Sequence, residues 1–248
     1  MFTGIRIGIP SASGFVGPSL DAQVQAALVG KKAVMLDMTD LSTLYQDTAG
    51  TTPVTTIGQS IARVNDKSAS ANHATQSTAG LRPLLQTNNG KYAAQFDGTN
   101  DALILPNISW TGGALNSFVA LNIGASIKGV HIWRTADGVS GYWGAWESGV
   151  GISPTASAVG SPTYAVNGVA VSPSTRARLY TMMNSQNTVL ESIGVTLSAN
   201  SALQIGGYGL PYALSGPVHR VLLVEGALTA PQIALFRTWT GQGIGLTL

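Results

Sequence analysis

One stretch, residues 92–106, most constrains what this chain can fold into. Tyr92, Ala94 and Phe96 alternate with other residues there, a run of polar turn-forming residues follows, and an apolar segment, 103–105, comes next. Alternation with a period of two places the three alternating side chains on one face of a strand, and the polar run reverses the chain. The sequence therefore predicts a hairpin of two strands, around which the core of a β-sheet protein can form.

The composition shows that this hairpin belongs to a folded domain. The chain has 248 residues, of which 44% are hydrophobic and only 10% are charged, and it contains 30 glycines. All-β domains of this length are often single units with many turns, and disordered chains have far more charge. The chain contains no cysteine. We therefore expect one main domain that is held by packing alone, without disulfides or thiolate metal sites.

The charge pattern excludes two classes of partner. The net charge is +2, and the only adjacent basic pair is Lys31 and Lys32. A surface that binds phosphates needs a basic stripe, so we expect neither nucleic acid nor a membrane as a partner. The N-terminus has no apolar run of signal-peptide length, which predicts a protein made in the cytoplasm without an ordinary export signal.

The segment before residue 33 predicts an attachment arm and a short helix. Ile5, Ile7 and Ile9 alternate as in an exposed strand, which either joins the domain's own sheet or docks on a neighbouring subunit. Residues 20–29 have helical spacing of apolar side chains, with Ser19 as the N-cap and Gly30 as the stop. The apolar positions of this helix are Leu20, Val24 and Leu28. We expect residues 1–32 to serve attachment and oligomerisation and to stay outside the core.

A second helix is predicted at the C-terminus. Thr229 and Gln232 have the spacing of a capping box, and Ile233, Phe236 and Trp239 form an apolar face at helical spacing. We expect this helix to pack back on the β-sheets.

The run Phe-Asp-Gly-Thr-Asn-Asp at residues 96–101, followed by an apolar strand, resembles the signature hairpin of concanavalin A-like lectin/glucanase domains. The similarity is greatest to the laminin-G-like jelly rolls of bacteria and phages. Blocks similar to other parts of that family occur in the expected order, at 33–40, 58–76, 203–207 and 215–229. The chain departs from the pattern at Val64, where the family typically has tryptophan.

The resemblance implies an all-β fold, an antiparallel β-sandwich of the concanavalin A-like jelly-roll type with short N-terminal and C-terminal helices. The domain would span residues 33–248, after the segment 1–32.

The same family includes retaining glucanases, whose two catalytic carboxylates lie about 5 Å apart, usually on one strand. The three glutamates, Glu147, Glu191 and Glu225, have no second carboxylate within five residues. We therefore expect no hydrolytic activity.

Two groups of aromatic residues are candidates for binding a glycan. Tyr142, Trp143 and Trp146 lie among glycines in a predicted loop, and Tyr208 and Tyr212 lie in a second glycine-rich turn. A ring can cover the apolar face of a sugar, but such residues also serve a subunit interface or the edge of a core. The sequence leaves both readings open.

Asp97, Asn100 and Asp101 offer oxygen ligands for Ca²⁺ within a short turn. Three side chains supply too few ligands for calcium, and the same residue types stabilise turns, so we expect turn stabilisation, with calcium as the alternative. The histidines are far apart in the sequence, and we expect structural roles for them; they are His73, His131 and His219.

Together these features predict a non-enzymatic bacteriophage virion structural protein, such as a head decoration, head fibre or tail-fibre component. Its lectin-like domain would bind host-surface polysaccharide, and the protein would contact other virion proteins as a homo-oligomer, with a trimer favoured. The alternative is a free-standing glycan-binding protein or glycoside hydrolase of the same fold.

Overall fold

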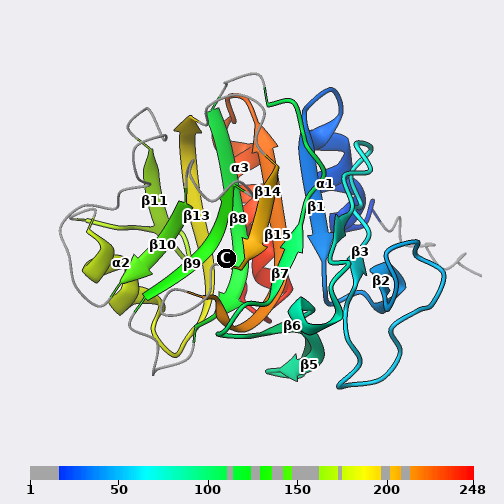
Figure 1. Cartoon of the computed structure of the whole chain (residues 1–248). Helices are drawn as coiled ribbons and strands as arrows, with labels where there is room; N and C mark the ends of the chain where they lie inside the picture. Colours follow the sequence, from blue (N-terminus) through cyan, green and yellow to red (C-terminus); the bar gives the residue numbers. More distant parts are fainter. Residues whose placement is uncertain are drawn as a thin grey trace, which may run out of the picture.

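The computed structural model describes residues 17–110, 114–123, 162–172, 175–196, 202–207 and 213–248, together with the backbone of 129–135 and 142–146 (Figure 1). These residues form two antiparallel β-sheets, three α-helices and two short 3₁₀ helices, η1 (Leu41–Thr43) and η2 (Ala79–Leu81). The isoleucines of the predicted arm, Ile5, Ile7 and Ile9, lie outside the described residues.

The first sheet has eight strands in the order β12-β11-β13-β8-β15-β6-β5, and β1 also pairs with β15. Its strands are β1 (Ala33–Asp37), β5 (Leu84–Asn88), β6 (Lys91–Asp97), β8 (Ala114–Asn122), β11 (Thr163–Val166), β12 (Val169–Ala170), β13 (Asn187–Thr196) and β15 (Ser215–Glu225).

The second sheet has seven strands in the order β10-β9-β14-β7-β4-β3-β2. Its strands are β2 (Leu44–Tyr45), β3 (Arg63–Val64), β4 (Ala74–Thr75), β7 (Ala102–Ile104), β9 (Gly129–Thr135), β10 (Tyr142–Trp146) and β14 (Leu203–Gly206).

The main core lies between the two sheets. Phe96 and Val119 of the eight-stranded sheet and Leu103 and Ile205 of the seven-stranded sheet are buried in one cluster. Val64, at the position where the resemblance led us to expect tryptophan, belongs to the same cluster. The expected all-β sandwich is therefore confirmed at the level of two packed antiparallel sheets.

The strand and turn predicted at residues 92–101 are present, but the predicted hairpin is wrong. Strand β6 pairs with β15 and β5, whereas β7 pairs with β14 and β4 in the other sheet. The turn therefore carries the chain from one sheet across to the other. Its tight bend places Gly98 at φ +77°, a conformation that glycine adopts readily. Alternation predicted the strands correctly, but it contains no information about which strand each one pairs with.

Two helices form a third layer on the eight-stranded sheet (Figure 1). Helix α1 (Leu20–Leu28) begins at Ser19, and helix α3 (Ala230–Gln242) begins with the predicted capping box. Val24 and Leu28 of α1 pack in one buried cluster with Phe236 and Trp239 of α3 and with residues from the outer face of the sheet; these are Ala33, Met35, Phe118, Leu222 and Val224.

The expectation that residues 1–32 stay outside the core is therefore wrong for α1. Leu20 packs against this cluster as well, so all three apolar positions predicted for attachment pack on the sandwich. The physical reason lies in β1 and β15, whose side chains are apolar on both faces, so that the outer face needs a cover.

Polar contacts tie α1 to the rest of the domain. The indole Nε1 of Trp239 donates to Asp21 of α1 at 2.7 Å. Lys67 forms an ion pair with Asp21 and a second one with Asp40 at 3.0 Å. Arg220 of β15 lies over the Trp239 ring, 4.6 Å from its centroid, and pairs with Asp37 at 2.9 Å.

Three elements differ from the expectations or were not anticipated. Residues 142–146 form strand β10, where we expected a loop. Helix α2 (Arg176–Met183) and strand β13 were not predicted, although Leu179 and Met183 of the helix lie in the main core. Asn167 and Gly168 both have positive φ between β11 and β12, as is usual for an Asn-Gly hairpin turn.

Candidate functional site

A row of paired residues crosses the seven-stranded sheet from β3 to β10. In register order these residues are Arg63, Thr75, Ile104, Gln204, Arg134 and Tyr142. Directly paired residues share one face of a sheet. Leu103, the neighbour of Ile104, is fully buried in the core, whereas Ile104 is 36% exposed. The part of the row around Ile104 therefore lies on the outer face of the sandwich.

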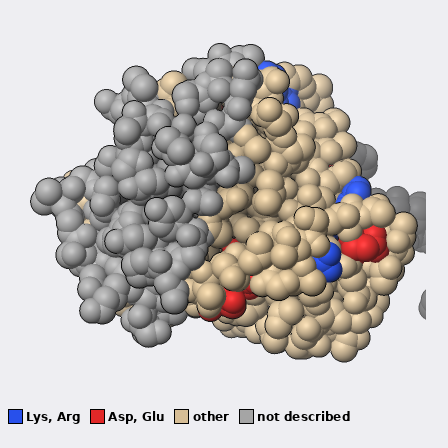
Figure 2. Space-filling model, viewed as in Figure 1, with Lys and Arg blue, Asp and Glu red and all other residues tan. Residues whose placement is uncertain are grey.

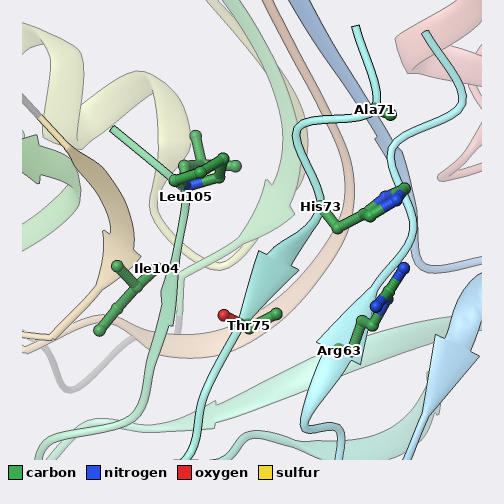
Figure 3. Close-up of a pocket in the computed structure, with 7 residues that line it drawn as sticks. Arg63, Ala71, His73, Thr75, Ile104 and Leu105 are labelled. Carbon is green, nitrogen blue, oxygen red and sulfur yellow. The ribbon is translucent and has the colours of Figure 1, made fainter. Parts of the chain in front are cut away.

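A pocket of 410 Å³ lies at the β3 end of this row (Figure 3). Seven residues line it: Arg63, Ala71, His73, Thr75, Ile104, Leu105 and Pro106. Its volume is within the range of about 300–1,000 Å³ that is usual for small-molecule sites. Figure 3 shows the Arg63 guanidinium below the His73 ring, with both side chains directed to the same side of the view, while Ile104 and Leu105 come from β7 and the residue that follows it.

The guanidinium of Arg63 is held firmly by the chain around it. Its Nε donates to Asn65 Oδ1 at 2.7 Å, and its Nη1 donates to the carbonyl oxygens of Thr48 and Ala49 at 3.1 and 3.2 Å. Gly50 packs against it so closely that a Cβ at this position would lie 3.2 Å from Arg63 Cζ. The arginine side chain is therefore fixed before any ligand arrives.

Asp47 orders the loop that supplies these carbonyl oxygens. Its carboxylate accepts hydrogen bonds from the backbone N–H of Gly50 at 2.7 Å and of Thr52 at 2.6 Å. The backbone N–H of Thr51 also donates to it, and these bonds hold the pKa of Asp47 below its ordinary value. Asp47 therefore stays ionised, and the loop around Arg63 stays closed.

His73 is oriented by the backbone. Its Nδ1 accepts a hydrogen bond from the N–H of Asp66 at 3.0 Å, so the neutral ring carries its proton on Nε2. Burial, and then the charge of Arg63, lower the pKa of His73 below its ordinary value. The ring is therefore a neutral donor at neutral pH. This bond is the loop-end role that we expected for a structural histidine, and the same residue also lines the pocket.

The carboxylate of Asp66, close to His73, accepts several hydrogen bonds from the surrounding chain. It accepts from the backbone N–H of Met35, Ser68 and Asn72 at 2.7–2.8 Å and from the Ser68 hydroxyl at 2.7 Å. It therefore stabilises the wall of the pocket and is not aimed at a ligand.

The pocket thus combines hydrogen-bond donors with an apolar surface. Arg63, His73 and Thr75 supply N–H and O–H groups, and Ile104 and Pro106 supply hydrocarbon. None of the lining residues is a carboxylate or a cysteine. This arrangement can bind a ligand, but it contains no nucleophile paired with a general base.

The structure places one of the predicted aromatic residues in the same row as the pocket. The backbone of Tyr142 pairs with Arg134 at the β10 end of the row. Trp143 pairs with Trp133, in the next row, which also contains Leu103 and Ile205 of the core. Trp146 is the last residue of β10. Tyr208 and Tyr212 lie outside the described residues.

The turn at residues 97–101 uses its oxygen atoms for its own backbone. Asp97 Oδ1 accepts from the N–H of Thr99 at 2.7 Å and of Asn100 at 3.2 Å. Asp101 Oδ2 accepts from the N–H of Asp97 at 2.9 Å. Burial, and then the charge of Asp97, raise the pKa of Asp101 to about 6. These bonds support turn stabilisation over calcium binding for Asp97, Asn100 and Asp101.

Searching the described parts of the chain for three or more His, Cys, Asp or Glu side chains placed to share a metal ion gives no such group. Nor is any of the described helices long and apolar enough to cross a membrane.

A second pocket, of 380 Å³, lies beside helix α1. It is lined by Gln25, Ala26, Val29, Lys67, Ser68 and Ala69. Lys67 forms ion pairs there with three aspartates, Asp21, Asp37 and Asp40. This pocket therefore offers fewer free donors than the pocket at Arg63.

The sequence alone did not identify Arg63, Thr75 or Ile104 as site residues. They lie in short strands, and only the register of two strand pairs, β3 with β4 and β4 with β7, brings them together. His73 is the one lining residue that the sequence analysis named, and we expected a structural role for it. Compared with known proteins, the chain matches no family model, no curated protein and no solved structure at a significant level.

Proposed function

We propose that this protein is a non-enzymatic structural protein of a bacteriophage virion, with a jelly-roll sandwich that binds host-surface glycan. The observation that supports binding is the pocket at Arg63 on the outer face of the seven-stranded sheet. Sugars combine hydroxyl groups with apolar ring faces, and a site for them needs donors beside hydrocarbon. The pocket contains both kinds of group in fixed positions.

The state of the buried carboxylates argues against hydrolysis. Glu191 forms a bidentate pair with Arg237, with nitrogen to oxygen distances of 2.7 and 2.9 Å, and Asp37 pairs with Arg220. Glu225 lies 4.0 Å from Lys32, and Glu147 lies outside the described residues. A retaining glycosidase needs two carboxyl groups about 5 Å apart that face the substrate. The described glutamates instead stabilise the sandwich.

The virion assignment rests on the sequence. The resemblance to laminin-G-like jelly rolls of phages, the lack of cysteine and the alternating isoleucines of the N-terminal segment together favour a domain displayed on a particle. A head decoration, head fibre or tail-fibre component would have this organisation.

Two measurements test the proposal. The isolated protein should bind glycans of a bacterial surface on an array, and it should co-purify with particles when it is expressed together with the other virion proteins. Polysaccharides incubated with it should release no new reducing ends. Glycan binding without any association with particles would favour the free-standing glycan-binding protein instead. Release of reducing ends that disappears in Glu147→Gln would contradict the non-enzymatic assignment.

A further inference from the structure

We propose that the pocket at Arg63 recognises a sugar that carries a carboxylate, such as a uronic acid unit of an acidic polysaccharide. The inference deepens the proposed glycan-binding function and rests on it. It is carried by the geometry of a fixed arginine whose charge has no acidic partner among the described residues, a neutral histidine beside it and apolar residues in the same pocket.

The first step concerns the charge of Arg63. Its Nε and Nη1 are bound to neutral oxygen atoms, of Asn65, Thr48 and Ala49. The described part of the chain provides no acidic partner within ion-pair distance of it. Arg220 and Arg237, in contrast, each pair with an aspartate or a glutamate. The Nη2 edge of Arg63 thus remains for a ligand, and a planar guanidinium is well suited to a carboxylate.

The second step concerns the residues beside the arginine. Since Nδ1 of His73 accepts from the backbone, its Nε2–H is the ring donor that is left. Thr75, which also lines the pocket, lies on the paired strand, directly opposite Arg63 in the register. An anion at Arg63 would therefore have further donors within the same pocket, and sugar hydroxyls could use the rest.

The third step concerns the kind of anion. Ile104 is 36% exposed on the outer face, and Pro106 lines the pocket with it. Such hydrocarbon suits the apolar face of a pyranose ring and offers nothing to an inorganic anion. Figure 2 shows that charged side chains are sparse and scattered on the described part of this face. A nucleic acid or a polyphosphate would need several cations together, so a sugar with a single carboxylate per unit fits better.

The test compares acidic polysaccharides with their own neutral forms. Polygalacturonate, alginate and hyaluronan are each measured beside a carboxyl-reduced sample of the same polymer, with the full-length protein, by biolayer interferometry. We expect at least one acidic polymer to bind, and its reduced form to bind at least tenfold more weakly. This comparison uses the wild-type protein and does not depend on how any variant folds.

Variants then locate the site. Arg63→Gln should weaken binding of the acidic polymer at least tenfold and leave binding of the reduced form unchanged. Lys91→Gln removes the same charge from an exposed position of β6, away from the pocket, and should change binding less than twofold. Thermal unfolding of each variant shows whether the fold is retained.

The outcomes separate the two proposals. Equal binding of acidic and reduced polymers, or binding of neutral glycans alone, would overturn the carboxylate inference and leave glycan binding intact. Loss of binding in Lys91→Gln to the same extent as in Arg63→Gln would overturn it as well, because net charge and not the pocket would then explain the effect. Absence of binding to every acidic and neutral glycan would overturn the proposed glycan-binding function together with the inference.

Discussion

At the residue scale, the least expected environment is that of His219. Its side chain is fully buried, its Nδ1 lies 3.0 Å from the carbonyl oxygen of Tyr92, and its Nε2 is a buried atom that has no hydrogen-bond partner in the described structure. Burial lowers the pKa of His219 to about 4, against the smaller opposing effects of the Tyr92 carbonyl and Asp37. The ring is therefore neutral in the folded protein over most of the pH range.

The first prediction follows from this pKa. The unfolded chain takes up a proton on this histidine near pH 6.5, whereas the folded chain does so only near pH 4. The free energy of unfolding should therefore fall as the pH decreases from 6.5 to 4, by on the order of 2 kcal/mol from this group. Urea unfolding of the wild type and of His219→Gln at pH 7 and pH 4 measures it. The variant should lose the part of the pH dependence that comes from His219. If the free energy of unfolding changed equally between pH 7 and pH 4 in both proteins, the role of His219 would be contradicted.

At the element scale, two glycines at the ends of strands show that backbone conformation and steric crowding are separate constraints on a position. Gly206 ends β14 at φ +70°, and a Cβ there would lie 2.7 Å from the carbonyl oxygen of Asp101 and 2.8 Å from the Phe96 ring. Gly90, between β5 and β6, has nearly the same φ of +72°, but a Cβ there would meet nothing within 4 Å. The two positions therefore differ in crowding and share the backbone conformation.

The second prediction uses this pair. Gly90→Ala should destabilise by about 1 kcal/mol, the cost of a left-handed conformation for alanine. Gly206→Ala should cost this amount and roughly 1–3 kcal/mol more, because the turn and the Phe96 ring must move apart. Chemical denaturation measures both. Equal effects would show that the contact between β14 and the turn at 97–101 is looser than the structure indicates.

The elements that the sequence predicted correctly are those whose signal is local. The caps at Ser19 and Thr229 depend on bonds within a few residues, and both are present. Strand β10 was mistaken for a loop because its glycine suggested a turn, but a register shift between Trp143 and Gly144 shows that the strand continues through a β-bulge.

At the scale of the whole molecule, α1 links the N-terminal segment to the sandwich, which changes what a truncation should do. Residues 17–30 contribute Val24 and Leu28 to a buried cluster and Asp21 to the indole of Trp239. The attachment role that we expected for residues 1–32 stays a prediction.

The third prediction compares two deletions. Removing residues 1–16 should leave a cooperative fold with a melting temperature within a few degrees of the full chain. Removing residues 1–30 should cost several kcal/mol, because the outer face of β1 and the indole of Trp239 lose their cover, and each kcal/mol lowers the melting temperature by about 2–4 °C at this size. Differential scanning calorimetry distinguishes the two. A 31–248 protein as stable as the full chain would contradict the role of α1 as part of the core.

The fourth prediction concerns assembly. Only 10% of the residues are charged, and the alternating isoleucines near the N-terminus suggest pairing with another chain. We expect a homo-oligomer, a trimer first of all, by size-exclusion chromatography with light scattering. The 17–248 protein should be a monomer in the same measurement. A monodisperse monomer of the full chain at tens of micromolar would count against the prediction.

The candidate site could not be predicted from the sequence, because it is a property of the assembled sheet. Arg63 and Ile104 are far apart in the chain, and they meet through Thr75 only when β3, β4 and β7 are in register. Nor does the sequence show that Asp47 and its loop hold the Arg63 guanidinium from the side. The aromatic residues were easier to notice, and one of them, Tyr142, lies at the opposite end of the same row.

The position of β15 has a consequence for how the protein is made. This strand comes late in the chain, yet it pairs with β8 along one side and with β6 and then β1 along the other. At roughly 5–20 residues per second of synthesis, β1 leaves the ribosome on the order of ten seconds or more before β15 exists. During that time the apolar faces of β1, β6 and β8 have no central strand to join them. Folding should therefore be completed only after β15 has left the ribosome, at the slow rate typical of sheets with distant pairings, and the nascent chain should depend on chaperones until β15 is inserted.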